Sequence, residues 1–108
     1  MTALLVALGA AVGGPLRFLL ASRLDDRLPW GTFVVNVTGS ALLGALSAAA
    51  LSGPATAVLA TGFCGGFTTY SAFAVQTHAL GPRWGAGYAV LTIAASLAAC
   101  GLAFWLAA

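Results

Sequence analysis

Residues 62–73, GFCGGFTTYSAF, interrupt the third of four apolar stretches in this chain of 108 residues. Three glycines and two β-branched threonines stand in residues 62–69, where a helix crossing a membrane would prefer leucine or alanine. Such a run within a span predicts a helix that breaks at mid-membrane. A break frees backbone carbonyls, which suit a small cation, and backbone amides at a restarted helix, which suit an anion.

The apolar stretch around this run extends from the turn at residues 52–54 to about residue 81. The other three cover residues 2–22, 30–51 and 83–107. Each can cross a bilayer, because a hydrocarbon core about 30 Å thick needs about 20 helical residues. The composition is 61% hydrophobic and 6% charged, and the mean hydropathy is +1.03. We therefore predict an all-α integral membrane protein of four transmembrane helices, with the third helix broken.

Charged side chains are few and lie mostly between the apolar stretches. They are Arg17, Arg23, Arg27, Arg83, Asp25 and Asp26. This set contains no basic patch, so nucleic acid is not predicted as a partner. Three of the four arginines fall in the first and third loops, which predicts that these loops are cytoplasmic.

The second apolar stretch carries a polar row at four-residue spacing, formed by Thr32, Asn36 and Ser40. These side chains share one helix face. Thr32 and Ser40 are typical of packing between membrane helices. The Asn36 carboxamide either bonds to another helix or donates to an anion that is losing its water. The spacing favours neither interpretation.

A second row, Tyr88, Thr92 and Ser96, repeats this spacing in the fourth stretch. Taken alone, such hydroxyls more often pack helices or bond to a carbonyl one turn earlier. Together with the row that contains Asn36, they also fit a polar slot between two helices.

Tyr70, Phe73 and Arg17 each allow a structural and an anion-related interpretation. Tyr70 and Phe73 lie three residues apart beyond the glycine run, so they either pack in the core or present weakly positive ring edges to an anion. Arg17 lies near the end of the first stretch. Its side chain either reaches the headgroups or raises the anion concentration in a vestibule.

The whole chain resembles the Fluc (CrcB-type) fluoride channel family. The residues that carry the resemblance are Gly13-Gly14 with Arg17-Phe18, the run Trp30 to Asn36 with Gly39-Ser40, and residues 62–73. Tyr70 departs from the pattern, because many relatives carry phenylalanine at this position, and its hydroxyl adds a hydrogen-bond donor.

The resemblance implies that residues 1–108 form a single four-helix channel domain, and that two such chains pair as an antiparallel, dual-topology dimer. Two narrow and passive fluoride pathways would each be lined by both subunits. A structural sodium ion at the dimer centre would be held by the backbone carbonyls of Gly65 and Thr68. The implied pathway residues are the pore asparagine Asn36, the aromatic residues Tyr70 and Phe73, and the polar track of Ser71, Tyr88, Thr92 and Ser96, with Arg17 in the vestibule.

The function implied by the resemblance is the export of cytoplasmic fluoride across the cell membrane of a bacterium, which gives fluoride resistance. A homodimer is favoured, because all the pore motifs are present in this one chain. A heterodimer with an oppositely inserted paralogue stays open, since the arginine distribution predicts one preferred orientation.

Three other classes of function compete with a channel. A small multidrug-type proton-coupled exporter needs a carboxylate within the membrane, but the sequence has no Glu, and Asp25 and Asp26 lie in a loop. A structural subunit without transport activity stays open. An enzyme is not predicted, because no nucleophile, base and orienting group share a recognisable spacing.

Cys64 and Cys100 indicate neither a disulfide nor a metal site.

Overall fold

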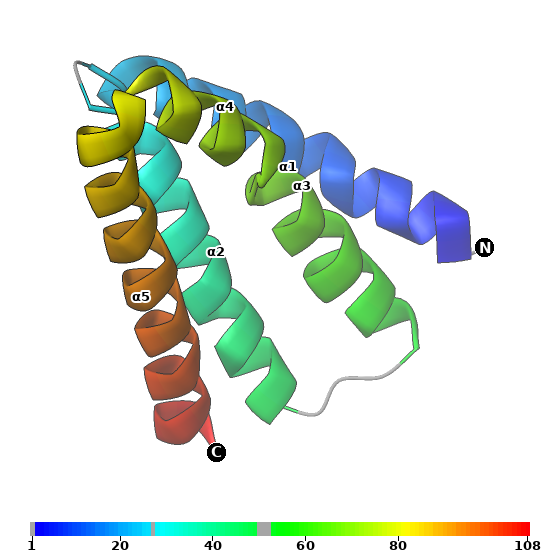
Figure 1. Ribbon diagram of the computed structural model, residues 1–108. Helices are drawn as coiled ribbons and strands as arrows, with labels where there is room; N and C mark the ends of the chain where they lie inside the picture. Colours follow the sequence, from blue (N-terminus) through cyan, green and yellow to red (C-terminus); the bar gives the residue numbers. More distant parts are fainter. Residues whose placement is uncertain (1, 27, 50–52) are drawn as a thin grey trace.

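The computed structural model describes residues 2–26, 28–49 and 53–108, which form helices joined by short connections (Figure 1). In chain order they are α1 (Thr2–Leu24), α2 (Trp30–Ala48), the π-helix η1 (Thr56–Cys64), α3 (Gly65–Phe67), α4 (Ser71–Ala79) and α5 (Gly81–Ala107). Among the described residues, four spans are long and apolar enough to cross a membrane: Thr2–Leu24, Trp30–Ala48, Thr56–Ala79 and Gly81–Ala107. The prediction of an all-α chain with four helical spans long and apolar enough to cross a membrane is confirmed.

The ends of the helices differ slightly from the predicted boundaries. α1 continues to Leu24 rather than ending at residue 22, and α2 ends at Ala48 rather than at Leu51. Leu51, Ser52 and Arg27 lie outside the described residues. Gly53 and Gly81 have φ angles of 61° and 85°. Glycine adopts this left-handed conformation without steric cost, which lets the chain turn sharply before η1 and at the start of α5.

The spans pack as two pairs: α2 lies along α5, and α1 lies along η1 and α3 (Figure 1). Small residues make both contacts close. A Cβ atom on Gly44 of α2 would collide with the carbonyl oxygen of Cys100 in α5, and one on Gly9 of α1 would collide with that of Val58 in η1. Helices in a membrane associate through such contacts, because burial of apolar side chains drives little association in lipid.

Large apolar side chains face outward along all four spans. Examples are Leu8 and Phe18 on α1, Leu43 on α2, Val75 on α4 and Leu97 on α5. In α5 only 6% of the most apolar window is buried. A surface of this kind is expected when lipid rather than water surrounds the helices.

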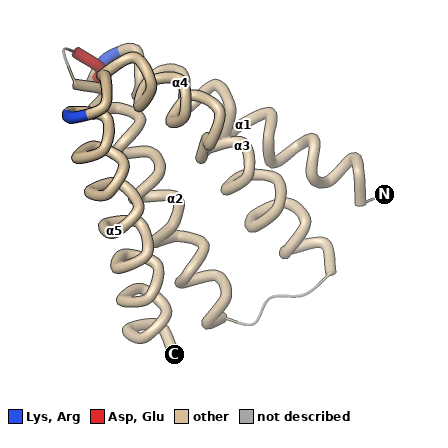
Figure 2. Tube along the Cα trace, viewed as in Figure 1, with Lys and Arg blue, Asp and Glu red and all other residues tan. Residues whose placement is uncertain are grey.

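Charged residues gather at one end of the molecule, where α1 leads to α2 and α4 leads to α5 (Figure 2). The Asp25 carboxylate connects three segments there. Its Oδ1 accepts a hydrogen bond from the Thr32 backbone N–H at 3.1 Å, and its Oδ2 accepts one from Gln76 Nε2 at 3.2 Å. A carboxylate at the start of a helix also interacts favourably with the helix dipole. Asp25 therefore ties the first loop to α2 and α4.

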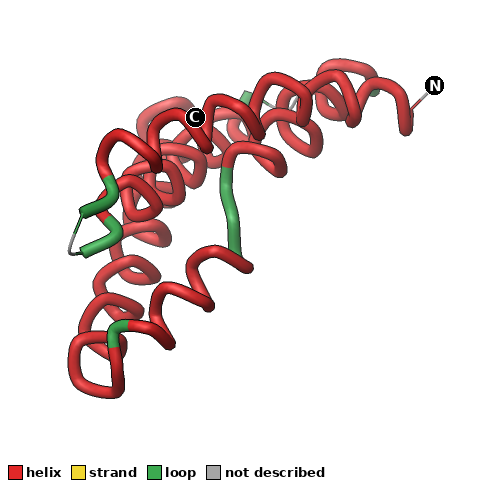
Figure 3. Tube along the Cα trace, turned by 90° about the horizontal axis from the view of Figure 1, so that it is seen from above, coloured by secondary structure: helices red, strands yellow, loops and turns green. Residues whose placement is uncertain are grey.

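The third span consists of two helical pieces joined by a short loop (Figure 3). Helical residues end at Phe67, Thr68 is extended with a ψ angle of 159°, and α4 begins at Ser71. The first piece is mostly the π-helix η1, which the residue pattern did not predict. π-Helical geometry is rare and frequently lies at functional sites.

Candidate functional site

Asn36 on α2 contacts the loop of the third span at two points. Its Nδ2 donates to the carbonyl oxygen of Thr69 at 3.1 Å, and its Oδ1 accepts from the Thr69 backbone N–H at 2.9 Å. One side chain thus satisfies both polar groups of a residue whose helical partners are lost. Gly39, one turn further along α2, leaves room for the Thr68 side chain to approach.

The backbone N–H groups of Thr69 and Ala72 donate to side chains rather than to the carbonyls they would reach in a continuous helix. In an α-helix the Thr69 N–H would donate to the Gly65 carbonyl and the Ala72 N–H to the Thr68 carbonyl. Here the Thr69 N–H donates to Asn36, and the Ala72 N–H donates to the Thr69 hydroxyl at 3.1 Å. The carbonyls of Gly65 and Thr68 therefore lose their helical donors, and these are the two carbonyls predicted as cation ligands.

A groove of about 470 Å³ lies between α2, the third span and α5. It brings together many of the predicted site residues, which come from separate parts of the sequence. Those that line it are Asn36, Gly65, Thr68, Tyr70, Phe73, Thr92 and Ser96. Ser71 lies beside the groove at the start of α4, with its hydroxyl 3.4 Å from that of Thr69.

Three aromatic rings follow one another from the exposed loop into the interior. Tyr70 is 81% exposed, whereas Phe73 and Tyr88 are buried. The ring centroids are 6.3 Å apart for Tyr70 and Phe73 and 5.8 Å apart for Phe73 and Tyr88. The Tyr88 hydroxyl donates to the carbonyl oxygen of Pro29 at 3.0 Å. Phe73 thus joins the exposed Tyr70 to a tyrosine held against α2.

Two hydroxyls of α5 are buried without a hydrogen-bond partner among the described residues, namely Thr92 Oγ1 and Ser96 Oγ. Thr92 is only 3% exposed, and both residues line the groove. A buried polar group without a partner costs about 1–3 kcal/mol. Among the described residues, neither hydroxyl bonds to a carbonyl one turn earlier.

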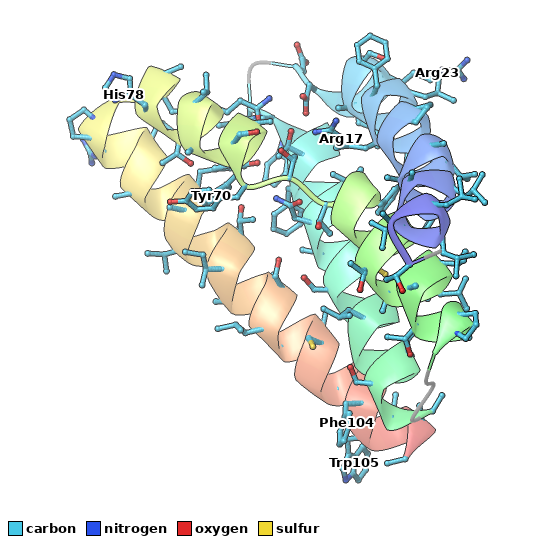
Figure 4. All side chains as sticks on the ribbon, turned by 90° about the vertical axis from the view of Figure 1, so that its right-hand side faces the viewer. Arg17, Arg23, Tyr70, His78, Phe104 and Trp105 are labelled. Carbon is cyan, nitrogen blue, oxygen red and sulfur yellow. The ribbon has the colours of Figure 1, made fainter. Side chains whose placement is uncertain are left out.

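Arg17 lies apart from the groove, on α1. Figure 4 shows its side chain pointing towards the neighbouring helices, whereas Arg23 points outward from the end of α1. Its Nε is buried without a partner among the described residues. Arg17 does not line the groove, so any effect on an ion there is exerted at a distance.

Residues 4–108 match the family described as "CrcB-like protein, Camphor Resistance (CrcB)". The chain belongs to the CrcB family. This CrcB chain is 48% identical over 108 residues to "Fluoride-specific ion channel FluC 2" of Rhodococcus jostii, and the match covers 98% of the chain and 95% of that protein. It is 42% identical over 120 residues to "Fluoride-specific ion channel FluC 1" of Streptomyces avermitilis, covering 99% and 96%. The predicted family resemblance is confirmed.

A third CrcB relative, "Fluoride-specific ion channel FluC 1" of Thermobifida fusca, is 45% identical over 114 residues, covering 88% of this chain and 95% of that protein. The similarity therefore extends over the four spans and the loop between α3 and α4. None of these alignments assigns a role to a single residue of this chain, so the predicted site residues stay predictions.

Sequence reasoning missed two polar contacts that organise this CrcB fold. Thr69 was not singled out, although its backbone and hydroxyl both fix the loop. Gln76 was given no role, although it donates to Asp25 across 51 residues of sequence. An asparagine in the middle of a span indicates that its side chain bonds to another polar group, but its spacing does not identify that group.

Proposed function

We propose that this CrcB protein is a passive, fluoride-selective channel with two pores in an antiparallel dimer. The names of its relatives support fluoride as the ion. The observation that carries the proposal is the pair of buried, unpartnered hydroxyls of Thr92 and Ser96 in a largely apolar groove. An anion that leaves water needs hydrogen-bond donors to replace its hydration shell, and these hydroxyls are free to donate.

Asn36 adds a donor and also sets the shape of the pathway. A carboxamide nitrogen carries two N–H groups, and one of them is used by the Thr69 carbonyl. The other N–H is available to an ion in the groove. Asn36 thus has one N–H left to donate to an ion, while its oxygen holds the Thr69 amide in place.

The aromatic residues form the adjoining part of the pathway. Ring edges carry partial positive charge, so fluoride passes the edges of Tyr70 and Phe73 rather than their faces. The Ser71 hydroxyl adds a donor beside them. Tyr88 donates its hydroxyl hydrogen to Pro29 and does not line the groove, so only its ring, next to that of Phe73, borders this pathway. Arg17 makes the entrance weakly positive, which raises the local fluoride concentration.

Surfaces that one subunit leaves uncovered at the groove support the proposed dimer. Tyr70 is 81% exposed, and the space around Gly65 is open. A second copy, inserted in the opposite direction, covers these surfaces and completes both pathways. The interrupted third spans then cross at mid-membrane. A homodimer is favoured because this chain carries the full set of predicted pore residues, and an oppositely oriented paralogue is the alternative partner.

A structural sodium ion fits the backbone of the interrupted span. The Gly65 and Thr68 carbonyls have lost their helical donors, and carbonyl oxygens suit a small hard cation. Two subunits would supply four such oxygens, whereas one subunit supplies only two. When bound, the ion supplies fixed positive charge that stabilises the two loops against each other.

The cellular role is the relief of cytoplasmic fluoride, which gives fluoride resistance. Passive conduction suffices, because fluoride flows outward when it accumulates inside. The bacterial relatives, such as that of Rhodococcus jostii, support location in the cell membrane of a bacterium. A proton-coupled exporter is less well supported, because both carboxylates, Asp25 and Asp26, lie outside the four spans.

The test is ion release from liposomes that contain only this purified protein. One set is loaded with fluoride and another with chloride, and an ionophore relieves the voltage in both. We expect rapid loss of fluoride and retention of chloride. Release of both ions would refute selectivity. Release of neither ion would indicate that a paralogue is required or that the protein does not transport ions.

A further inference from the structure

A second cavity, of about 570 Å³, lies between the beginnings of α2 and α5. The residues that line it are Leu28, Trp30, Arg83, Trp84, Gly87, Tyr88 and Leu91, so the predicted pathway residue Tyr88 lies here and not in the groove. Its residues Leu28, Arg83 and Trp84 lie near the end of the molecule where the charged residues gather (Figure 2). That end is the membrane–water boundary, because the spans run from it into the apolar part of the molecule. The cavity shares no lining residue with the groove that holds Thr92 and Ser96, although the Tyr88 ring lies 5.8 Å from the ring of Phe73, which lines the groove.

The lining changes from cationic to apolar with depth. Arg83 is exposed, and neither Asp25 nor Asp26 lines the cavity. Trp30 and Trp84 are 42% and 66% exposed, as is typical of indoles at the headgroup level. Leu91 lies eight residues beyond Arg83 on the same helix, which places it about 12 Å deeper at 1.5 Å per residue. The cavity thus combines a guanidinium at the surface with an apolar wall below it.

Gly87 leaves an open slot between these two levels. Arg83, Gly87 and Leu91 recur at four-residue spacing, so they lie on one face of α5. A Cβ atom built on Gly87 meets nothing within 4 Å. This glycine is therefore not required for close packing of the helices, unlike Gly44. Its missing side chain makes room along α5 for a narrow apolar chain.

We propose that this cavity binds an anionic phospholipid of the surrounding leaflet. Its phosphate pairs with the Arg83 guanidinium, since guanidinium groups bind phosphate with two parallel hydrogen bonds. Its headgroup lies between the indoles of Trp30 and Trp84, and one acyl chain runs along the slot at Gly87 to Leu91. Basic pockets between helices at the cytoplasmic face of a membrane commonly bind such lipids.

Charge favours a lipid over a protein partner in this cavity. The sequence has only two acidic residues, Asp25 and Asp26, and both lie at the same end as Arg83. A second copy in the antiparallel orientation presents its opposite end, where the sequence places no Asp or Glu side chain to pair with Arg83. Asp25 of the same subunit is already bonded to Thr32 and Gln76. An anionic lipid supplies the missing negative charge.

Tryptophan quenching by brominated lipids tests this proposal without any measurement of fluoride. Trp105 lies near the C-terminus, at the end opposite the cavity (Figure 4). The Trp105→Phe protein therefore reports only from Trp30 and Trp84. A matched protein that carries Trp30→Phe and Trp84→Phe reports only from Trp105. Both full-length proteins are placed in vesicles of phosphatidylcholine with a small fraction of brominated phosphatidylglycerol or brominated phosphatidylcholine.

We expect phosphatidylglycerol to compete for the cavity indoles about fivefold better than phosphatidylcholine, the ratio for one arginine near an anionic surface. The Trp105 reporter shows no such preference. Arg83→Gln abolishes the preference, whereas Arg23→Gln, at the same end but outside the cavity, leaves it intact. Gly87→Leu fills the slot and reduces quenching by both lipids.

Three results would overturn the proposal. Equal quenching by the two lipids would remove the specificity for anionic lipid. Equal loss of preference in Arg23→Gln and Arg83→Gln would show diffuse surface attraction instead of a site. Absence of quenching by either lipid would show that protein covers the cavity in the membrane.

Discussion

Replacing Asn36 with leucine removes the only side chain that bonds to both backbone groups of Thr69 among the described residues. Leucine has the same branching as asparagine, with two methyl groups in place of the amide oxygen and nitrogen, and has no polar side-chain atom. The loop between α3 and α4 then keeps its sequence but loses both hydrogen bonds between Thr69 and α2. The Thr69 N–H and C=O are left to find other partners in a region that contains little water.

The size of the effect follows from the two groups that lose their partner. An unsatisfied buried backbone group costs about 1–3 kcal/mol, whereas a polar side-chain bond between membrane helices contributes about 0.6 kcal/mol on average. Thr69 is only partly buried, so relaxation recovers some of the cost. We expect the local opening of this loop to become easier by about 2 kcal/mol, a change of about 30-fold in its equilibrium.

Hydrogen exchange of the segment 65–74 measures this opening directly. We expect the Thr69 amide to exchange about 30-fold faster in Asn36→Leu than in the unchanged protein, because each 1.4 kcal/mol is about tenfold. Thr38→Leu is the matched control, since Thr38 is an exposed position on the same helix. Equal exchange of the Thr69 amide in both variants would refute the assigned role of Asn36. Fluoride flux should fall in Asn36→Leu but not in Thr38→Leu.

Three further substitutions give distinct results. Gly44→Ala places a Cβ against the Cys100 carbonyl and should lower the free energy of unfolding, measured by titration with a denaturing detergent, by about 1–3 kcal/mol. Gly101 has open space around it, so Gly101→Ala should leave the free energy of unfolding almost unchanged in the same titration. Thr92→Val removes a buried unpartnered hydroxyl, so it should preserve or raise stability. It should also slow fluoride release about tenfold, because a hydrogen bond to an ion contributes at least about 1.5 kcal/mol. Unchanged release would exclude Thr92 as a donor. Phe73→Ile should slow fluoride release without altering the elution volume of the purified protein, and an unchanged rate would exclude the ring-edge contact.

The four spans were predictable from the sequence because lipid imposes a simple physical requirement. Every backbone polar group in the hydrocarbon must be satisfied within the segment, so each span must be a long apolar helix. The interruption is different, since the run of residues 62–69 signals poor helix formation without specifying geometry. The change of partners at Thr69 and Ala72 follows from tertiary contacts, which no local pattern contains.

The site residues were predictable as a group but not in their individual contacts. Spacing placed Thr92 and Ser96 on one face of a helix, and both line the same groove as Asn36. The spacing of Asn36 left its role open between helix contact and anion contact. Its partner lies 33 residues away in the sequence, and only the packing of α2 against the third span brings the two together.

The reversal potential across a planar bilayer tests passive and selective fluoride conduction most directly. Purified protein is exposed to a tenfold fluoride gradient, with equal chloride on both sides and an impermeant anion to balance the charge. A passive fluoride-selective pore predicts a reversal potential of about 59 mV, the value for a tenfold gradient of one monovalent ion. A value near zero, or one that moves with an imposed proton gradient, would contradict the account.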